Sequence, residues 1–435
     1  MPKSNNFHEN KNKKIRNVYL DYAAATPLEP TVSSVMQKVY REHFASPSSI
    51  HNLGIEAGIV LEKSRNDVAL ILGARSAEII FTSGSTESNN LAILGVLSAT
   101  EERLPHIVTT NIEHSSILEI CRYLERTNKV KVTYVEVEAN GIINSKKIKE
   151  ALNKDTVLVS VMYANSEIGA IQPLQEIAKE IRHFNKINNK KIIFHTDATQ
   201  AVNYLPIQVF KLGVDLMSMS SVKFYGPKGV GMLYIKKNTA IKKIMQGGDQ
   251  QFDLRAGSYN LPSIAGLAEA LKITEKIKEK EIARLIKLRD YFFGKISERN
   301  SLLWGLSPAL EPRVSAPSID GDSDPRKNEF RSEILINGDL KNRLPNNINI
   351  TILNIPSDLL VIELSAKGIM ASAKSACKSG DGKASYVIKA INKSIKDTDG
   401  SLRFSLGRGT TKSDVDYTIK ILSQILLKLE KWYGV

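Results

Sequence analysis

The sequence feature that most constrains the fold is an alternation of short apolar runs with helix-like segments between residues 77 and 235. Short apolar runs bounded by turn residues are typical of buried strands, and apolar residues that recur every three or four positions indicate amphipathic helices. A chain that alternates strand and helix builds a mostly parallel sheet with helices on both faces. We therefore predict one doubly wound α/β unit in this region. The seven apolar runs are residues 78–81, 107–110, 130–137, 157–162, 191–195, 214–219 and 231–235.

A second unit is expected after residue 260, where the pattern changes. Residues 264–296 have helical spacing over a length that can connect two units. A mixture of strands and helices follows, and 435 residues are enough for more than one hydrophobic core. The stretch 307–332 contains four prolines with several Ser and Asp residues, a composition that favours a flexible insertion. Later elements are expected as strands at 347–353 and 402–405 and as helices at 357–367 and 412–432.

The chain carries 60 Lys and Arg residues against 46 Asp and Glu residues, a net charge of +14. Such an excess can attract acidic partners such as RNA. Much of it, however, is Lys in Asn- and Ile-rich stretches such as 186–191, which favours a solvated surface over a dedicated nucleic-acid stripe. Direct binding to nucleic acid is therefore not expected.

Cysteine usage and the lengths of the apolar runs indicate the compartment. The two cysteines, Cys121 and Cys377, lie far apart in sequence, which excludes a disulfide framework and favours a reducing compartment. No apolar run is long enough to span a bilayer, and residues 1–16 lack the apolar core of a targeting segment. We expect a cytoplasmic protein without a membrane partner.

Polar segments follow five of the expected strands at the point where each strand ends. In an open parallel sheet, ligands bind in the crevice at the carboxyl ends of the strands. The first segment, 82–88, is a turn with Gly and hydroxyl residues that opens a helix, so its backbone N–H groups can hold a phosphate, although similar turns are also ordinary helix caps. The other segments are 113–114, 165–167, 197–200 and 220–229.

Three side chains in these segments favour pyridoxal phosphate as a cofactor. A lysine such as Lys223 can bind an aldehyde cofactor covalently, a carboxylate such as Asp197 can hold a pyridinium nitrogen protonated, and a histidine such as His114 can stack or shuttle protons. Each residue also has a structural alternative: His114 as a helix cap, Asp197 as a turn residue and Lys223 as a solvated loop lysine. Their joint occurrence favours the cofactor site.

The two cysteines differ in their surroundings. Cys121 lies at helical spacing among apolar residues, which indicates a small core residue. Cys377 lies in a Ser-, Lys- and Gly-rich loop, where Lys374 and Lys378 favour the thiolate, which is the nucleophilic form. The histidines show no metal-type spacing, so no metal site is expected.

Seven sequence motifs occur in order along the chain, at residues 19–27, 83–90, 165–169, 197–200, 223–229, 375–377 and 403–408. In these motifs the chain resembles the cysteine desulfurases of the class V aminotransferase superfamily, of the iron–sulfur-assembly type with a long cysteine-bearing loop. The resemblance covers nearly everything from Val18 to the C-terminus. It implies the PLP-dependent transferase fold of the aspartate aminotransferase type: α/β, with a large, doubly wound, mostly parallel sheet domain and a smaller α+β domain.

The resemblance also implies a division of the chain into three parts. Residues 1–30 would form an N-terminal segment that packs with the small domain. Residues 31–275 would form the large domain that binds pyridoxal phosphate. Residues 276–435 would form the small C-terminal domain, which carries the cysteine loop and the flexible insertion at 307–332.

The resemblance assigns cofactor-binding roles residue by residue. Lys223 would hold pyridoxal 5'-phosphate covalently, Asp197 would pair with its pyridine nitrogen, and Gln200 would bond its phenolic oxygen. His114 would stack on the ring and assist proton transfer. The remaining cofactor-binding residues would be Thr86 and Ser220 at the phosphate, Ser85, Asn165, and Ser258, which would reach the phosphate from the neighbouring subunit of a homodimer.

The implied reaction converts L-cysteine to L-alanine. Asn165 and Arg403 would orient the substrate carboxylate, the arginine through its bidentate fork. The Cys377 thiolate would attack the substrate sulfur and carry it as a persulfide to sulfur-acceptor proteins for iron–sulfur cluster assembly or tRNA thiolation. Two alternatives stay open: a selenocysteine lyase or another class V aminotransferase, and a non-catalytic scaffold.

Three departures from the family pattern bear on this interpretation. Val222 stands where the family commonly has histidine immediately before the cofactor lysine. The Gly-rich stretch that usually precedes an Arg-Ser-Gly-Thr motif is altered at 247–254, and the motif itself reads Arg-Ala-Gly-Ser at 255–258. The Pro-rich insertion is also atypical. A lost hydrogen bond costs about 1 kcal/mol, so we expect weaker cofactor binding but not its loss.

Overall fold

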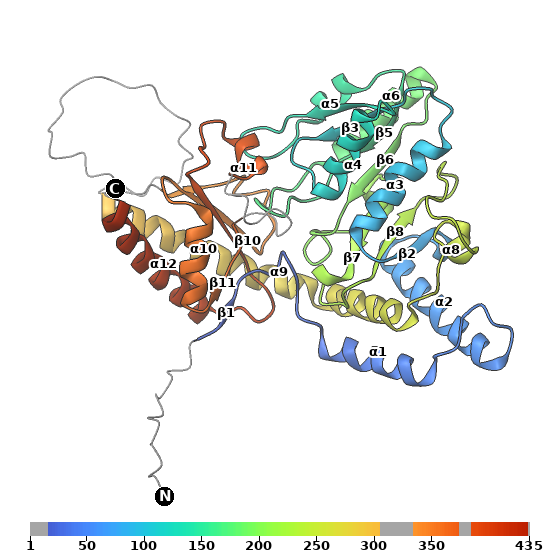
Figure 1. Cartoon of the computed structure of the whole chain (residues 1–435), viewed down its shortest axis with the longest axis horizontal. Coiled ribbons are helices and arrows are strands. Elements are labelled where there is room, and N and C mark those ends of the chain that lie inside the picture. The colour runs from blue at the N-terminus through green and yellow to red at the C-terminus, as the bar shows by residue number, and fades with distance from the viewer. Residues whose placement is uncertain (1–15, 305–333, 374–383, 434–435) are drawn as a thin grey trace, which may run out of the picture.

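The computed structural model describes residues 16–304, 334–373 and 384–433. Two units lie side by side and share one long helix, α9 (Leu261–Trp304) (Figure 1). The insertion expected at 307–332 and the loop residue Cys377 lie outside the described residues.

The larger unit is built on a seven-stranded sheet of order β2-β8-β7-β6-β5-β3-β4. Every neighbouring pair is parallel except the two pairs that include β8. All seven predicted apolar runs overlap these strands, with ends displaced by at most two residues, and the prediction of a mostly parallel sheet is confirmed. The strands are β2 (Ile79–Thr82), β3 (His106–Thr110), β4 (Lys131–Val135), β5 (Thr156–Ser160), β6 (Ile193–Asp197), β7 (Leu216–Ser220) and β8 (Gly231–Ile235).

Helices cover both faces of this sheet, which explains why its strands have continuous apolar runs. Side chains alternate across a strand, so Val108 of β3 packs with Phe194 of β6 in one core, whereas Ile107 packs with Ile193 in another. A strand that is buried on both faces carries no polar alternation. The helices of this unit are α1 (Pro30–Glu42), α2 (Asn52–Leu72), α3 (Ser85–Ala99), α4 (Ser115–Arg126), α5 (Ser145–Ala151), α6 (Leu174–Asn188), α7 (Val209–Leu212) and α8 (Gln250–Asp253).

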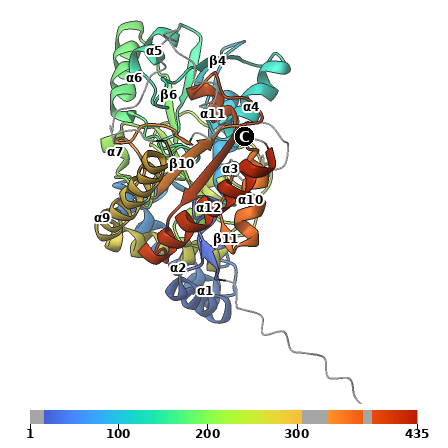
Figure 2. The same cartoon turned by 90° about the vertical axis from the view of Figure 1, so that its left-hand side faces the viewer.

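The smaller unit contains a three-stranded antiparallel sheet of order β12-β10-β9. Phe404 of this sheet packs against Phe292 of α9 in a core that also receives Leu426 of the last helix. The N-terminal strand crosses to this unit and pairs in parallel with β11. The elements, seen from this side in Figure 2, are β1 (Val18–Tyr19), β9 (Ile334–Ile336), β10 (Asn347–Ile352), α10 (Ser357–Ala366), β11 (Ile369–Met370), α11 (Tyr386–Ile391), β12 (Gly400–Ser405) and α12 (Lys412–Tyr433).

Helix α9 belongs to both units. It packs against α1 and α2 in the larger unit and against α12 and β10 in the smaller one. Its 44 residues correspond to a length of about 66 Å, and the helix predicted at 264–296 is confirmed with a longer extent. The boundary expected near residue 275 falls inside this helix, and the three-part division stays a prediction. Neither α9 nor any other described helix is long and apolar enough to cross a lipid bilayer.

The Phe404→Ala variant is expected to lose about 3–5 kcal/mol of unfolding free energy, because it opens a cavity where α9 meets the small sheet. Phe404 is fully buried, and its ring centroid lies 5.1 Å from that of Phe292. Urea unfolding measures the loss. Phe210→Ala is the control: that ring is 68% exposed, so the change should stay within about 0.5 kcal/mol. Equal losses in the two variants would contradict the assigned core.

Candidate active site

A hydrogen-bonded network joins two of the segments, 113–114 and 197–200, through helix α3 at the carboxyl edge of the large sheet. Asn89, on α3, donates through Nδ2 to the Asp197 carboxylate at the end of β6 and to the Ser116 hydroxyl on α4, each at 2.8 Å. The Ser116 hydroxyl in turn lies 2.8 Å from Nδ1 of His114. The predicted residues His114 and Asp197 are thereby connected, and Asn89 is the residue that connects them.

Asp197 is buried at the end of β6, and both of its carboxylate oxygens accept hydrogen bonds. One oxygen accepts from Asn89, and the other accepts from the backbone N–H of Thr199 at 2.9 Å. The second bond is that of a turn residue, so the structural alternative considered for Asp197 also holds. Because both donors are neutral, they orient the carboxylate without compensating its negative charge.

His114 is the N-cap of α4, and its Nδ1 accepts from the backbone N–H of Ser116 at 3.2 Å. Burial lowers the pKa of this histidine, and the nearby Asp197 carboxylate opposes that effect. A ring whose Nδ1 accepts a hydrogen bond carries its proton on Nε2 when neutral. The helix-cap alternative is therefore correct for Nδ1, and it leaves Nε2 available for another partner.

Lys223 lies at the end of a short 3-10 helix, η2 (Ser221–Lys223), directly after β7. Its ammonium donates to the carbonyl oxygens of Ala23, at 2.9 Å, and Ala24, both in the N-terminal segment. The Gln200 side chain donates to the same Ala23 oxygen at 3.0 Å. Lys223 is therefore held within the crevice next to Gln200, unlike the solvated loop lysine that was the structural alternative.

The first turn of α3 offers a place for a phosphate. The helix begins at Ser85 after Gly84, and no side chain caps its first N–H groups. Such groups, together with the positive end of the helix dipole, favour an anion. Ser220 at the end of β7 lies close by: a Cβ added at Gly84 would be 3.7 Å from the Ser220 hydroxyl. A Cβ at Gly231 would lie 2.6 Å from the Cα of Gly84, so the close contact of β8 with this turn requires glycine.

A charge pair stands beside this turn. Glu87 accepts from the Ser83 backbone N–H at 2.7 Å and pairs with Arg255, whose Nε lies 2.7 Å from its carboxylate. Burial acts to raise the pKa of Glu87, but the hydrogen bonds from Arg255 and Ser83 outweigh it and lower the pKa overall. The negative charge of Glu87 near the helix N-terminus is thereby compensated by Arg255.

Arg403, on β12 of the smaller unit, reaches the same crevice. It is 1% exposed, pairs with Asp21 at 2.7 Å and donates to the Ser166 carbonyl at 3.2 Å. Its Nε is buried without a hydrogen-bond partner among the described residues. Asn165, which precedes Ser166, is also buried, and its side chain bonds the backbone of its own loop and of Ile112.

Comparison with known proteins shows to which family the chain belongs. The pattern of the family described as Aminotransferase class-V matches residues 18–318. The chain belongs to the class V aminotransferase family. Within it, the chain is 41% identical to the cysteine desulfurase IscS of Dictyoglomus turgidum, over 95% of each chain. It therefore belongs to the cysteine desulfurases of this family.

Solved structures of family members have the same fold. A NifS-like protein, 32% identical, superposes with a TM-score of 0.81 and covers 94% of this chain and 99% of its own. A second structure, SspA in complex with cysteine, is 29% identical, with a TM-score of 0.70 over 89% of this chain and 98% of its own. The expected PLP-dependent transferase fold is thus confirmed.

Pyridoxal phosphate is the cofactor of this desulfurase family, and the residues of the crevice fit it. The uncapped start of α3 suits the phosphate, and the Asp197 carboxylate suits a protonated ring nitrogen. Two buried polar atoms around Asp197 lack partners within the described residues, Oδ1 of Asn89 and Oγ1 of Thr199. Buried polar atoms are normally paired, so these atoms are consistent with a polar ligand in the crevice.

The other predicted site residues are distributed as follows. Thr86 is exposed on the first turn of α3, and Ser258 is exposed on the segment after Arg255. Cys377 lies outside the described residues, but the chain on both sides of its loop is anchored in the crevice. Ser372 pairs through its backbone with Arg403, and the Ser385 hydroxyl donates to the Glu167 carboxylate. The individual binding and catalytic roles stay predictions.

Sequence reasoning missed the contributions of the N-terminal segment and of Asn89. The carbonyls of Ala23 and Ala24 bond Lys223, and backbone atoms leave no sequence signal. Asn89 did carry a signal, because it is an amide next to the mostly apolar residues that α3 buries. Cys121 was assigned correctly: it is fully buried, and burial raises the pKa of its thiol to about 12.

The His114 imidazole is expected to be neutral at pH 7, with a pKa below the ordinary 6.5. Protonation would turn Nδ1 into a donor and remove the cap bond from Ser116. The stability that depends on the neutral ring is therefore complete above pH 6.5 and is lost as the pH falls through the lowered pKa. An NMR titration of the histidine C–H signals, assigned with His114→Gln, measures this pKa. A midpoint above 6.5 would contradict the prediction.

Proposed function

We propose that this cysteine desulfurase converts L-cysteine to L-alanine with Lys223, His114 and Arg403 as its main acting side chains and passes the sulfur on through Cys377. The observation that carries the proposal is the meeting of Lys223, the His114–Asp197 network and Arg403 in one crevice, next to the anchored ends of the Cys377 loop. Bound pyridoxal phosphate supplies an aldehyde that captures amines and a ring that accepts electron density.

Each side chain has a role that follows from its surroundings. The Lys223 amine would hold the cofactor and would move a proton at the substrate Cα. Asp197, fixed by neutral donors, holds the proton on the cofactor ring nitrogen. The neutral His114 ring would stack on the cofactor and would exchange a proton through Nε2. Gln200 shares the Ala23 carbonyl with Lys223 and binds the phenolic oxygen of the cofactor.

The substrate carboxylate binds at Arg403. A buried guanidinium needs an anionic partner, and in this structure Asp21 is that partner. We propose that the substrate carboxylate shares or takes over the arginine fork from Asp21. Asn165, whose side chain bonds the backbone of its own loop and of Ile112, would hold the adjoining loop in place for this carboxylate. The cysteine held by the related SspA supports the assignment of L-cysteine as substrate.

Cys377 acts as the nucleophile that removes the sulfur. Its thiolate, favoured by Lys374 and Lys378, forms an S–S bond to the substrate sulfur. The substrate C–S bond breaks, its electron pair stays on the carbon, and a proton added there gives L-alanine. The outer sulfur of the persulfide then passes to an acceptor protein, for iron–sulfur cluster assembly or for tRNA thiolation. A reducing compartment such as the cytoplasm suits such a thiol.

Cys377→Ser is expected to abolish sulfide release from L-cysteine in the presence of a thiol reductant, at least about a hundredfold below wild type, because the other cysteine of the sequence, Cys121, is fully buried. Cys121→Ala is the matched control and should keep wild-type turnover, since Cys121 is buried and its thiol has a high pKa. Sulfide and alanine are measured together. Wild-type rates in Cys377→Ser would favour a selenocysteine lyase or another class V aminotransferase, and wild-type protein without any turnover would favour the scaffold.

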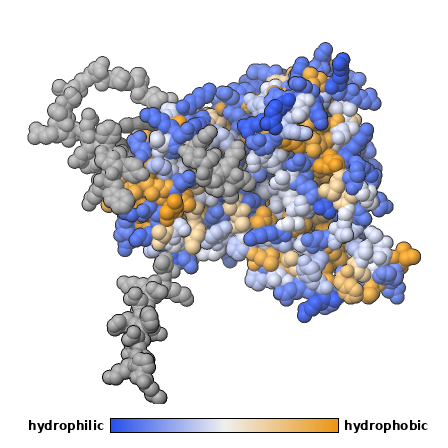
Figure 3. All heavy atoms as spheres, viewed as in Figure 1, coloured by the Kyte–Doolittle hydropathy of each residue, from blue (hydrophilic) through white to orange (hydrophobic). Residues whose placement is uncertain are grey.

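We also propose a homodimer. It is supported by an apolar surface formed by the end of α1, the loop that follows it and the start of α2. Tyr40, Phe44, Ile50, Ile55 and Ile59 are all more than half exposed, and Ile50 is 95% exposed. Figure 3 shows apolar side chains gathered at the edge of the larger unit over these helices. Exposed apolar patches of this kind mark protein interfaces. A second copy of this chain is the proposed occupant, and it would bring Ser258 to the phosphate of its partner.

The double variant Ile55→Lys/Ile59→Lys is expected to be a monomer at micromolar concentration, because two charges in an apolar interface stay unpaired. Sedimentation velocity measures the mass. Ile362→Lys is the control, since Ile362 is 65% exposed on α10 in the other unit, and it should keep the mass of wild type. A dimeric double variant, or a monomeric wild type, would refute the proposed interface.

A further inference from the structure

Tyr225, two residues after Lys223, has a backbone φ of 62°, in the left-handed region. A bulky side chain is unfavourable in this region, and such a conformation persists only where the surroundings hold it. Two bonds from the N-terminal segment do so: the Tyr225 N–H donates to the Thr26 hydroxyl at 2.7 Å, and its carbonyl accepts from the Glu29 N–H at 3.0 Å. Thr26 also bonds the carbonyl of Val222, so the same segment fixes both sides of Lys223.

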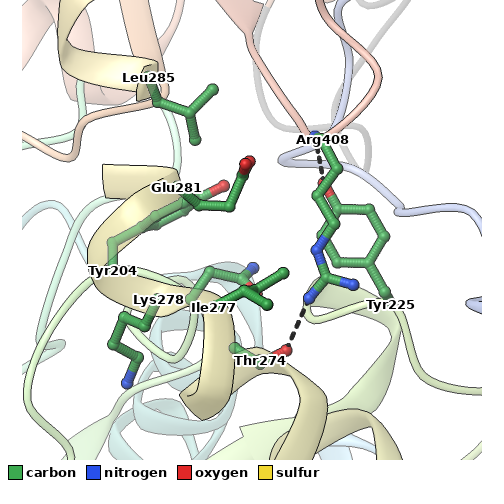
Figure 4. A pocket seen from close by; sticks show the side chains of 9 residues that line it. Tyr204, Tyr225, Thr274, Ile277, Lys278, Glu281, Leu285 and Arg408 are labelled. Atoms are coloured by element: carbon green, nitrogen blue, oxygen red, sulfur yellow. Dashed lines mark hydrogen bonds between the residues drawn. The ribbon is translucent and has the colours of Figure 1, made fainter. Parts of the chain in front are cut away.

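The side chain of Tyr225 is held by Arg408, which comes from the smaller unit. The guanidinium carbon lies 3.8 Å from the centre of the tyrosine ring. The Arg408 backbone N–H donates to the tyrosine hydroxyl at 2.8 Å. Figure 4 shows the arginine lying along the ring, at the edge of a small pocket where α9 passes between the units.

Arg408 is in turn fixed from three sides. Its guanidinium pairs with Glu29 at 2.8 Å and donates to the Thr274 hydroxyl of α9 at 3.0 Å. Arg284, also on α9, donates to the carbonyls of Gly407 and Thr410 and holds the turn that carries Arg408. Gly407 lies against the Tyr22 ring so closely that a Cβ would collide with it.

We infer that Arg408 and Tyr225 form a positioning pair that sets the distance between the cofactor lysine and the arginine that binds the substrate carboxylate, an inference that rests on the proposed function of Lys223 and Arg403. Lys223 precedes Tyr225 by two residues, and Arg403 precedes Arg408 by five residues at the end of β12. The stack therefore joins the turn that carries Lys223 to the segment that follows β12, the strand that carries Arg403. Neither member of the pair touches a reacting atom.

A purely structural role would also explain a buried stack, so the test needs a matched arginine. Arg16 makes the same kinds of contact: it lies over the Tyr417 ring at 5.2 Å and pairs with Asp414 at 2.7 Å. It also joins the N-terminal segment to the smaller unit, but it contacts neither Lys223 nor Arg403 among the interactions described. Loss of Arg16 therefore reports the effect of a similar stack away from the crevice.

The experiment compares Arg408→Lys, Tyr225→Phe and Arg16→Lys as holoenzymes. Lysine keeps the charge at position 408 but cannot form the planar stack and the forked bonds. Arg408→Lys should lower kcat/KM for L-cysteine by about tenfold to a hundredfold, with a raised KM. Tyr225→Phe, which keeps the ring and loses the hydroxyl acceptor, should lower it by about fivefold. Cofactor affinity, titrated by absorbance on the apo protein, should change less than about twofold, since the side chains of Tyr225 and Arg408 make no described bond to Ser220 or to the first turn of α3.

Product binding gives a readout besides turnover. Spectral titration of the holoenzyme with L-alanine should show weaker binding in Arg408→Lys and unchanged binding in Arg16→Lys. The double variant Arg408→Lys/Tyr225→Phe should lose more than Arg408→Lys alone, because the backbone N–H at position 408 still bonds the Tyr225 hydroxyl in that variant. Its loss should be smaller than the two single losses multiplied, because the residues are in contact. Arg408→Lys with wild-type kcat/KM, or with a loss no larger than that of Arg16→Lys, overturns the inference.

If wild-type protein does not turn over L-cysteine, the proposed function fails instead. Should Arg408→Lys not fold, Tyr225→Phe decides alone by the same criteria.

Discussion

Arg403 is almost fully buried, and its charge is met by Asp21 at 2.7 Å. Removing either partner of such a pair leaves an uncompensated charge in the protein interior, which is far more costly than the pair itself is stabilising. The pair therefore fixes where the N-terminal segment must run, between the two units and across the crevice. From that path the segment also presents its carbonyls to Lys223 and its Thr26 hydroxyl to Tyr225. The need to compensate the buried charge of Arg403 thus also determines how the N-terminal segment contacts Lys223 and Tyr225.

The carboxylates around the crevice differ in the groups that donate to them. Glu87 is paired with Arg255 at the phosphate turn, and Glu29 is paired with Arg408 beneath Tyr225. Asp197 instead receives its hydrogen bonds from an amide and a backbone N–H. A carboxylate whose donors are neutral has no compensating charge beside it, so its negative charge can stabilise a cationic group placed against it. The hydrogen bonds of Asp197 are therefore suited to a carboxylate that holds a protonated ring nitrogen.

Much of the fold could be predicted from the sequence, because buried parallel strands leave a continuous apolar signal and helices leave a periodic one. The strand at 231–235 was located to the residue, and the strand predicted at 191–195 was displaced by two residues because its last positions, Thr196 and Asp197, are polar. The segments of the crevice were predictable from topology, since strand ends meet at one edge. The roles assigned to single residues rested on the resemblance in motifs.

The contacts that sequence reasoning missed have a common physical origin. The carbonyls of Ala23 and Ala24 act through the backbone, and the stack of Arg408 on Tyr225 joins residues 183 positions apart. Neither kind of contact alters local composition or periodicity. The position of a domain boundary is equally hidden when a single helix such as α9 continues through it.

The pairing of the first strand-forming segment with the last has a consequence for biosynthesis. Arg403 and Asp21 are 382 residues apart, and Ser405 bonds Leu20 and Ala23 over similar separations. The larger unit can fold as soon as it leaves the ribosome, since domains fold as units during synthesis. Asp21 must then wait for a partner that is translated 382 residues later. A nascent chain therefore contains Lys223 and Asp197 long before it contains Arg403, and the crevice is complete only after β12 has been translated.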